Sequence, residues 1–216
     1  MQAKFLFTIM CLGMSVLACP QRGFAQELKS IMLPVPQTQG GKPLMEVLSQ
    51  RKSVREFSSK EIPLQVLSDL LWAACGINRP DSGKRTAPTA RNMQEIDVYV
   101  AKADGLYLYD AKENTLLPII AGDLRALTGK QEFVSQAPIN LIYVGDFSKM
   151  KGETSDMEFY SAVDTGYISE NVYLYCASEG LATVVRGLVD KTALAKAMKL
   201  RPEQKIILAQ TVGYPN

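Results

Sequence analysis

Histidine is absent from this chain of 216 residues. Without an imidazole there is no Ser-His-Asp triad, no Cys-His dyad and no His-rich zinc site, which removes many hydrolase and metalloenzyme mechanisms. Hydrophobic residues make up 47% of the sequence and charged residues 21%. This is the composition of an ordinary folded domain, which argues against disorder and fibrous architecture.

Net charge is also lacking. Two of the 24 basic residues and none of the 22 acidic residues fall within the first 25 positions, so the remainder of the chain is balanced. No excess of positive charge predicts binding to nucleic acid or to an anionic membrane surface. Of the four cysteines, only Cys75 and Cys176 follow the first 25 residues, and their apolar surroundings are more typical of buried thiols than of a disulfide.

Residues 1–25 have the pattern of an export signal. An apolar run of about 14 residues, Phe5 to Ala18, follows Lys4 and is too short to span a bilayer. Gly23-Phe24-Ala25 offers a cleavage site, which predicts a soluble exported protein. As an alternative, Val16 to Cys19 resembles the lipobox of bacterial lipoproteins and would attach a lipid to Cys19. We therefore expect a periplasmic or cell-envelope protein that contacts a membrane only if Cys19 is lipidated.

Two further regions follow. Residues 26–43 contain three prolines and two adjacent glycines, which exclude a stable helix and predict an extended arm. Residues 44–216 are predicted to form one domain. Apolar residues at helical spacing predict helices from Leu44 to about Ser49–Lys52 and from Pro63 to Gly76, and residues 76–91 read as an irregular basic loop.

Strand patterns dominate the second half of the chain, with one long helix among them. Ser155 to Glu179 contains no proline and has apolar residues on more than one face, which predicts a helix packed on both sides, one of them by a second copy of the chain. Because a hairpin interrupts the alternation of helices and strands, the sequence predicts the α+β class. The expected strands are 96–100, 106–109, 115–118, 139–144, 181–185 and 205–212, with a further helix at 192–200.

Arg51-Lys52-Ser53-Val54-Arg55 follows the first predicted helix. In an extended segment, Arg51, Ser53 and Arg55 would place two guanidinium groups and a hydroxyl on one side. Such groups suit a phosphate and the carbonyl oxygens of a flat heterocycle. The same cations also suit a helix C-terminus, whose dipole they stabilise, so the segment alone leaves both interpretations open.

Two other segments carry groups that suit a ligand. In the segment from Pro88 to Gln94, the side-chain amides of Asn92 and Gln94 offer donors and acceptors that match the edge of a pyrimidine-like ring. Gly180 to Leu188 combines a helix stop, a strand and a tight turn, in which Gly187 allows a close approach to the backbone beside Arg186. Each segment also has an ordinary interpretation as a turn.

Together, these segments resemble the nitroreductase family of FMN-dependent oxidoreductases, and the resemblance covers nearly all of residues 44–214. The order and spacing of four motifs agree with the family. They are an Arg-Arg-Ser-x-Arg-like signature at Arg51 to Arg55 followed by Phe57, a Pro-Ser-x-x-Asn-x-Gln-like segment at Pro88 to Gln94, an Asp-x-Gly-x-x-x-x-Asn pattern at Asp164, Gly166 and Asn171, and a Gly-Leu-strand-x-Gly ending at Gly180, Leu181 and Gly187. The resemblance implies a central, mostly antiparallel sheet flanked by helices, with the long helix at a homodimer interface.

The resemblance also implies an FMN site between two copies of the chain, and no metal. In similar proteins the residue at Arg51 holds the FMN phosphate with help from Ser53, and the residue at Arg55 faces the pyrimidine edge of the flavin. The remaining implied cofactor-binding residues are Lys52 in the same signature, Asn92 and Gln94 beside the ring, and Arg186 and Gly187 near its centre.

Two departures from the family pattern change these expectations. Relatives carry a basic pair after the final strand, where this chain has Gly213 to Asn216, so Arg85 or Arg91 is expected to help Arg51 neutralise the phosphate. The position of Arg186 is often acidic or small in relatives, so their substrate preference does not carry over.

The implied activity is a two-step hydride transfer from a donor such as NAD(P)H to a small nitroaromatic or quinone acceptor. Because NAD(P)H is a cytoplasmic reductant, export would require another donor or a physiological oxidation. One alternative is an FMN-dependent dehydrogenase that oxidises a peptide-derived or other small substrate, since the loop Trp72 to Arg79 is similar to that of the azoline-oxidising branch. A second alternative is a non-catalytic flavin-binding or scaffold protein.

Overall fold

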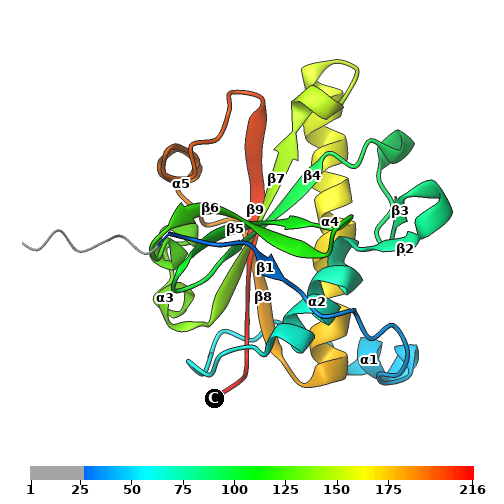
Figure 1. Cartoon of the computed structure of the whole chain (residues 1–216), viewed down its shortest axis with the longest axis vertical. Helices are drawn as coiled ribbons and strands as arrows, with labels where there is room; N and C mark the ends of the chain where they lie inside the picture. The colour runs from blue at the N-terminus through cyan, green and yellow to red at the C-terminus, as the bar shows by residue number, and fades with distance from the viewer. Residues whose placement is uncertain (1–26) are drawn as a thin grey trace, which may run out of the picture.

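A seven-stranded sheet forms the centre of the computed structural model, which describes residues 27–216 (Figure 1). The predicted signal at 1–25, with Cys19, lies outside the described residues. The strands are β1 (Ile31–Met32), β4 (Ile96–Ala101), β5 (Gly105–Asp110), β6 (Thr115–Ala121), β7 (Ile139–Asp146), β8 (Ala182–Arg186) and β9 (Gln204–Gly213). Their order is β1-β6-β5-β4-β7-β9-β8, and every neighbouring pair is antiparallel. The predicted α+β fold with an antiparallel sheet is confirmed.

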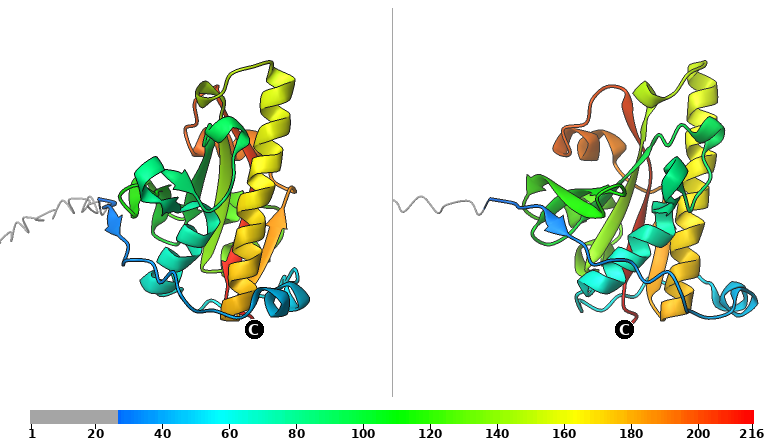
Figure 2. Two further views of the ribbon diagram at one scale, coloured as in Figure 1. Left: turned by 90° about the vertical axis from the view of Figure 1, so that its right-hand side faces the viewer. Right: turned by 45° about the vertical axis from the view of Figure 1, so that its right-hand side comes forward.

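Helices cover both faces of this sheet (Figures 1 and 2). The helices α2 (Leu64–Cys75) and α4 (Thr154–Glu179) pack together on one face, and α1 (Leu44–Gln50) contacts α4. The helices α3 (Phe133–Gln136) and α5 (Lys191–Ala197) lie on the opposite face. Helices therefore enclose the sheet on both faces, and loops lie at the two ends of its strands.

The short elements differ most from the sequence prediction. The loop at 76–91 contains a small hairpin of β2 (Ile77–Arg79) and β3 (Lys84–Arg85), closed by a hydrogen bond of 2.6 Å from Arg79 to the Arg85 carbonyl. The helix expected at 192–200 ends earlier, because Lys199 adopts a φ of 55°. β1, α3 and the 3₁₀ helix Arg125–Thr128 were not predicted, since segments of two to four residues are too short to show a period.

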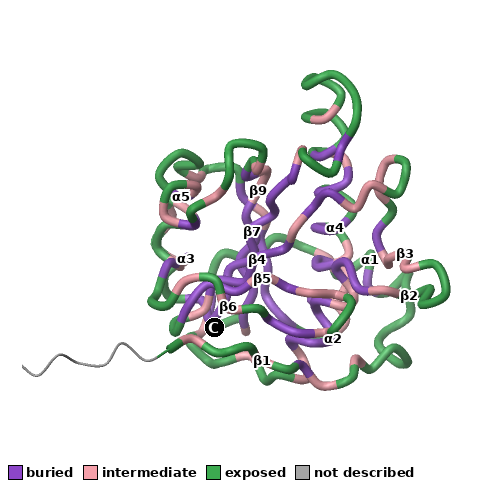
Figure 3. Tube along the Cα trace, turned by 45° about the horizontal axis from the view of Figure 1, so that its top comes forward, coloured by how far each residue is buried: buried purple, intermediate pink, exposed green. Residues whose placement is uncertain are grey.

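Buried residues gather where the sheet meets α2 and α4 (Figure 3). All positions of β7 are buried, because this strand lies inside the sheet and helices cover both of its faces. Cys75 and Cys176 are buried in the same core and form no disulfide within the described part of the chain. Burial raises the pKa of the Cys75 thiol to about 11, so it packs as a small hydrophobic side chain, as expected.

One side of α4 is packed and another is open. Ile168 and Val172 are buried against the sheet, whereas Phe159, Tyr160 and Tyr167 are 63%, 39% and 47% exposed. Packing on one side agrees with the prediction, and cover by a second copy stays a prediction. No helix within residues 27–216 has the length and hydropathy that crossing a bilayer requires.

Residues 27–43 lie along the domain and lead the chain to α4. β1 pairs with β6, and Leu33 is buried beyond it. The backbone N–H of Gln37 then donates to the Asp69 carboxylate at 2.8 Å, and that of Lys42 donates to Ser178 Oγ at 3.0 Å. These contacts set where α1 begins, beside the C-terminal end of α4, and so where the Arg51 to Arg55 segment starts.

Candidate functional site

The chain after α1 runs extended beside β8, the strand at one edge of the sheet. The backbone N–H of Val54 donates to the Thr183 carbonyl at 2.9 Å, which fixes the segment against an otherwise unpaired strand edge. Successive side chains of an extended segment point in opposite directions, so residues two apart share a side. Lys52 and Val54 line a cavity of about 570 Å³, while Ser53 reaches Tyr173 on α4.

Tyr173 connects this segment to the end of β8. Its hydroxyl accepts a hydrogen bond of 3.0 Å from the backbone N–H of Val185 and lies 2.8 Å from Ser53 Oγ. The guanidinium carbon of Arg51 lies 5.2 Å from the centre of the Tyr173 ring, within the range of a cation–π contact. The buried tyrosine thus places the Arg51 guanidinium and the Ser53 hydroxyl beside the end of β8.

Arg51 keeps most of its capacity to bind an anion. Its ionic neighbour Glu170 has an oxygen 4.0 Å from Nε, and both side chains are partly exposed, so this pair is weak. Lys52 and Arg55 are exposed, and neither forms a salt bridge with any residue of the described chain. The guanidinium groups and the hydroxyl of this segment make few strong contacts within the described chain. They are the donors that a phosphate requires, so these residues fit the phosphate of FMN.

Arg186 contributes its side chain to the fold. It is 4% exposed, and its guanidinium donates to Thr211 Oγ1 at 3.1 Å, to the Thr128 carbonyl at 2.7 Å and to Asn140 Oδ1 at 3.0 Å. Burial lowers its pKa to about 10. The exposed group at this end of β8 is the next residue, Gly187, whose backbone has no side chain to shield it.

The segment from Pro88 to Gln94 is fixed by its own side chains. The Gln94 amide nitrogen donates to the Gly83 carbonyl and to Asn92 Oδ1, and its oxygen accepts from Arg85 Nε at 2.8 Å. All three amide contacts of Gln94 therefore brace the loop. Asn92 is exposed, and its amide nitrogen donates to no group within residues 27–216.

A single copy of the chain does not bring all the predicted residues together. The loop is tied to α4 at Asp164, which accepts a hydrogen bond of 2.8 Å from the N–H of Ala90. Asp164 precedes Tyr173 by nine residues, which is about 14 Å along a helix. Arg51 and Ser53 therefore meet near the end of β8, while Asn92 and Gln94 lie beside an earlier part of α4.

Sequence patterns missed two residues that organise this region. Nothing in the sequence distinguishes Tyr173 from the other eight tyrosines, because its two polar partners lie in distant segments of the chain. Glu95 is fully buried directly after the loop. In the sequence, Glu95 is visible only as a charged residue between Gln94 and the first apolar residue of a strand. The same pattern is common on exposed strands.

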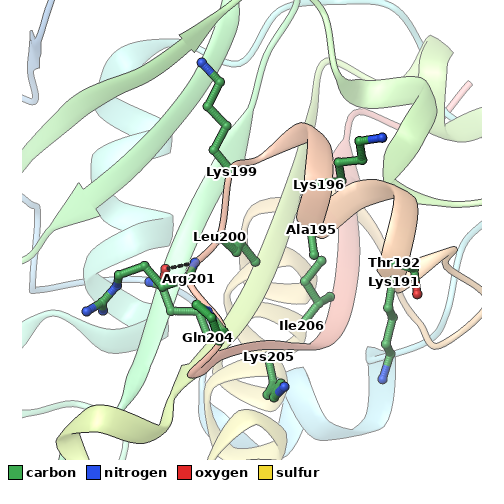
Figure 4. A pocket seen from close by; sticks show the side chains of 11 residues that line it. Lys191, Thr192, Ala195, Lys196, Lys199, Leu200, Arg201, Gln204, Lys205 and Ile206 are labelled. Atoms are coloured by element: carbon green, nitrogen blue, oxygen red, sulfur yellow. Dashed lines mark hydrogen bonds between the residues drawn. The ribbon is translucent and has the colours of Figure 1, made fainter.

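A second hollow lies on the opposite face of the sheet, between α5 and the start of β9 (Figure 4). It measures about 620 Å³, and none of the predicted site residues lines it. Within residues 27–216, Arg201 is the only one of its five cations in a salt bridge, to Asp146 at 2.6 Å. The cations are Lys191, Lys196, Lys199, Arg201 and Lys205.

Within residues 27–216, no three His, Cys, Asp or Glu side chains are placed to hold a metal ion.

Removal of the Tyr173 hydroxyl tests the connection between Ser53 and β8. In Tyr173→Phe, the Val185 N–H loses its acceptor and Ser53 its partner, so the free energy of unfolding should fall by about 1–3 kcal/mol. Urea denaturation measures this change. The matched control is Tyr167→Phe, an exposed tyrosine on the same helix, which should change stability by less than about 0.5 kcal/mol. Equal stability of the two variants would contradict the bridging role.

Comparison with known proteins agrees with this geometry. The model of the nitroreductase family matches residues 48–214. A Methanocaldococcus jannaschii protein named as a nitroreductase is 30% identical over 169 residues, covering 73% of this chain and 85% of its own length. A Ralstonia eutropha structure named as a nitroreductase has a TM-score of 0.84 and 44% identity, covering 90% of this chain and 92% of its own.

A more distant structure, described as a nitroreductase in complex with FMN from Desulfovibrio desulfuricans, shares the fold with a TM-score of 0.59 and 21% identity. The match covers 82% of this chain and 88% of that one. The family resemblance read from the sequence motifs is thus confirmed both by sequence and by fold. The chain belongs to the nitroreductase family of FMN-dependent oxidoreductases.

Proposed function

We propose that this protein is an exported, homodimeric FMN oxidoreductase that reduces small acceptors of the nitroaromatic or quinone type. The observation that carries the proposal is the cluster of Arg51, Ser53 and Tyr173 beside the exposed backbone of Gly187. This cluster offers an anion-binding side chain and an open strand end at one place. Both are features that a phosphorylated, flat cofactor requires.

The residues divide the work of holding FMN. Arg51 and Ser53 would bind its phosphate, Arg55 would lie at the pyrimidine edge, and the backbone at Gly187 would approach the ring. When bound, FMN supplies the hydride chemistry. The chain then holds the ring in place and supplies positive charge, which favours the addition of electrons at this site. This division of roles needs no histidine.

The homodimer is supported by the apolar surface around α4. Besides the exposed aromatic residues of α4, the contacting helix α1 exposes Leu44 by 62%, Met45 by 75% and Leu48 by 46%. A large exposed apolar surface of this kind usually marks an interaction site. A second copy on α4 would cover it, and would also bring a second Asn92 loop towards the Arg51 cluster.

Export is supported by the sequence of residues 1–25 and has its own test. In the native host, the wild-type chain should fractionate outside the cytoplasm. If the Cys19→Ser variant leaves the membrane fraction and becomes soluble, Cys19 carries a lipid, whereas identical soluble fractionation of both chains favours cleavage after Ala25. Cytoplasmic recovery of the wild-type chain would contradict export.

Anaerobic titration with NAD(P)H tests the activity. We expect the visible absorbance of the FMN-loaded full chain to bleach upon addition of NAD(P)H and to return when a quinone is added. Bleaching by dithionite but not by NAD(P)H would overturn the NAD(P)H-dependent reductase and favour the dehydrogenase alternative. Failure to take up FMN would favour the scaffold alternative.

A further inference from the structure

Two buried acidic side chains, one just before β4 and one on α4, lie close enough to interact where the Asn92 loop joins β4. Glu95 is 0% exposed and Asp164 is 2% exposed. Within residues 27–216, neither carboxylate oxygen of Glu95 has a hydrogen-bond partner that satisfies ordinary geometry. A buried carboxylate without a donor or a cation is strongly unfavourable, so an ionised Glu95 does not suit this position.

The surroundings of Glu95 favour its acid form. The only other titratable group of the described chain that acts on it is Asp164 from α4, and the neighbouring hydroxyl of Ser161 comes from the same helix. Burial, and after it the charge of Asp164, raise the pKa of Glu95 to about 7. Below about pH 7, Glu95 therefore has a proton to donate.

Asp164 also anchors a strained loop. It accepts the hydrogen bond from the N–H of Ala90, at the start of a turn in which Arg91, Asn92 and Gln94 have φ values of 53°, 56° and 49°. These left-handed conformations are unfavourable for residues with a Cβ and persist where surrounding contacts hold them. The Ala90–Asp164 bond is one such contact, and it joins the loop to α4.

We propose that Glu95 and Asp164 share one proton, and that this pair positions the loop carrying Asn92 for flavin binding. Glu95 donates its proton towards one oxygen of Asp164, and the other Asp164 oxygen holds the Ala90 N–H. When the proton leaves for solvent, two buried negative charges repel each other without a neutralising cation. The anchor then loosens, and the loop that carries Asn92 loses its tie to α4. This inference rests on the proposed FMN site.

The direction of the pH effect follows from the raised pKa. Glu95 keeps its proton below about pH 7 and loses it as the pH rises through that value. The affinity for FMN should therefore fall between pH 6.5 and 8.5. Because the FMN phosphate itself titrates near pH 6, the informative quantity is the pH dependence of the wild type relative to that of a variant.

Glu95→Gln is the central variant, because glutamine is neutral at every pH and keeps a donor facing Asp164. Fluorescence titration of the full chain with FMN should show a wild-type Kd about tenfold weaker at pH 8.5 than at pH 6.5, and a change of less than about twofold in Glu95→Gln. Glu113→Gln, an exposed carboxylate at the β5–β6 turn, should keep the wild-type pH dependence. Equal pH dependence of wild type and Glu95→Gln would overturn the proposal.

An infrared spectrum of the FMN-free protein gives a second readout. The C=O stretch of a buried protonated carboxyl should be present in the wild type at pH 6.5 and absent in Glu95→Gln. Its absence from the wild type would overturn the shared proton. If the band is present but FMN binds at no pH, the result supports the Glu95–Asp164 pair and contradicts the proposed FMN site. If Glu95→Gln does not fold, Asp164→Asn replaces it, with weaker FMN binding and little pH dependence expected.

Discussion

Replacing Arg51 with methionine should weaken FMN binding by about 10- to 150-fold, the effect of losing charge-assisted hydrogen bonds to a phosphate. Methionine keeps an apolar stem of similar length, and it removes the guanidinium together with its cation–π contact with the Tyr173 ring. Because the Arg51 side chain is 35% exposed and its ion pair is weak, the fold should remain intact. Fluorescence titration with FMN measures the effect.

Two further variants separate charge from geometry. Arg51→Lys keeps the charge but loses the planar fork, so its Kd should lie between those of the wild type and Arg51→Met. Lys112→Met removes a positive charge from a side chain that is 83% exposed, and its Kd should equal that of the wild type. Wild-type binding by Arg51→Met would show that the phosphate lies elsewhere.

Replacing Arg186 with methionine should lower the free energy of unfolding by about 2–4 kcal/mol, because three buried acceptors lose a charged donor together. The acceptors are the Thr128 carbonyl, Asn140 Oδ1 and Thr211 Oγ1, which belong to three separate segments of the chain. Urea denaturation of the FMN-free protein measures the loss of stability.

Arg55→Met serves as the matched control for stability, because Arg55 is exposed on the extended segment. It should change the free energy of unfolding by less than about 0.5 kcal/mol. If Arg186→Met is as stable as Arg55→Met, the buried hydrogen-bond network does not support the fold. In molecules that remain folded, Arg186→Met should weaken FMN binding less than Arg51→Met does, because its side chain points into the protein.

The sequence predicted the long elements because their patterns are periodic. The apolar face of α2, the unbroken length of α4 and the continuous apolar run of β7 each identify an element without reference to the rest of the chain. Short elements such as β1 and α3 depend on their neighbours instead. β1 forms because two residues of the arm pair with β6, and no local pattern records that partner.

The candidate site was predictable in its residue types and only partly in its arrangement. The signature at Arg51 and Ser53 predicts donors for a phosphate, but the hydrogen bond of Ser53 to Tyr173 joins residues that lie far apart in the sequence. Arg186 beside Gly187 looked like a ligand-binding cation. Its neutral partners come from distant segments, so tertiary packing alone decides that the side chain is buried.

The FMN content of the purified full-length chain tests the flavin site most directly. After incubation with FMN and gel filtration, the visible flavin absorbance is compared with the protein absorbance of the same peak. The proposed site predicts about one FMN per chain in a peak of dimer size. A peak of folded protein that retains no FMN would contradict the site at Arg51 and Ser53.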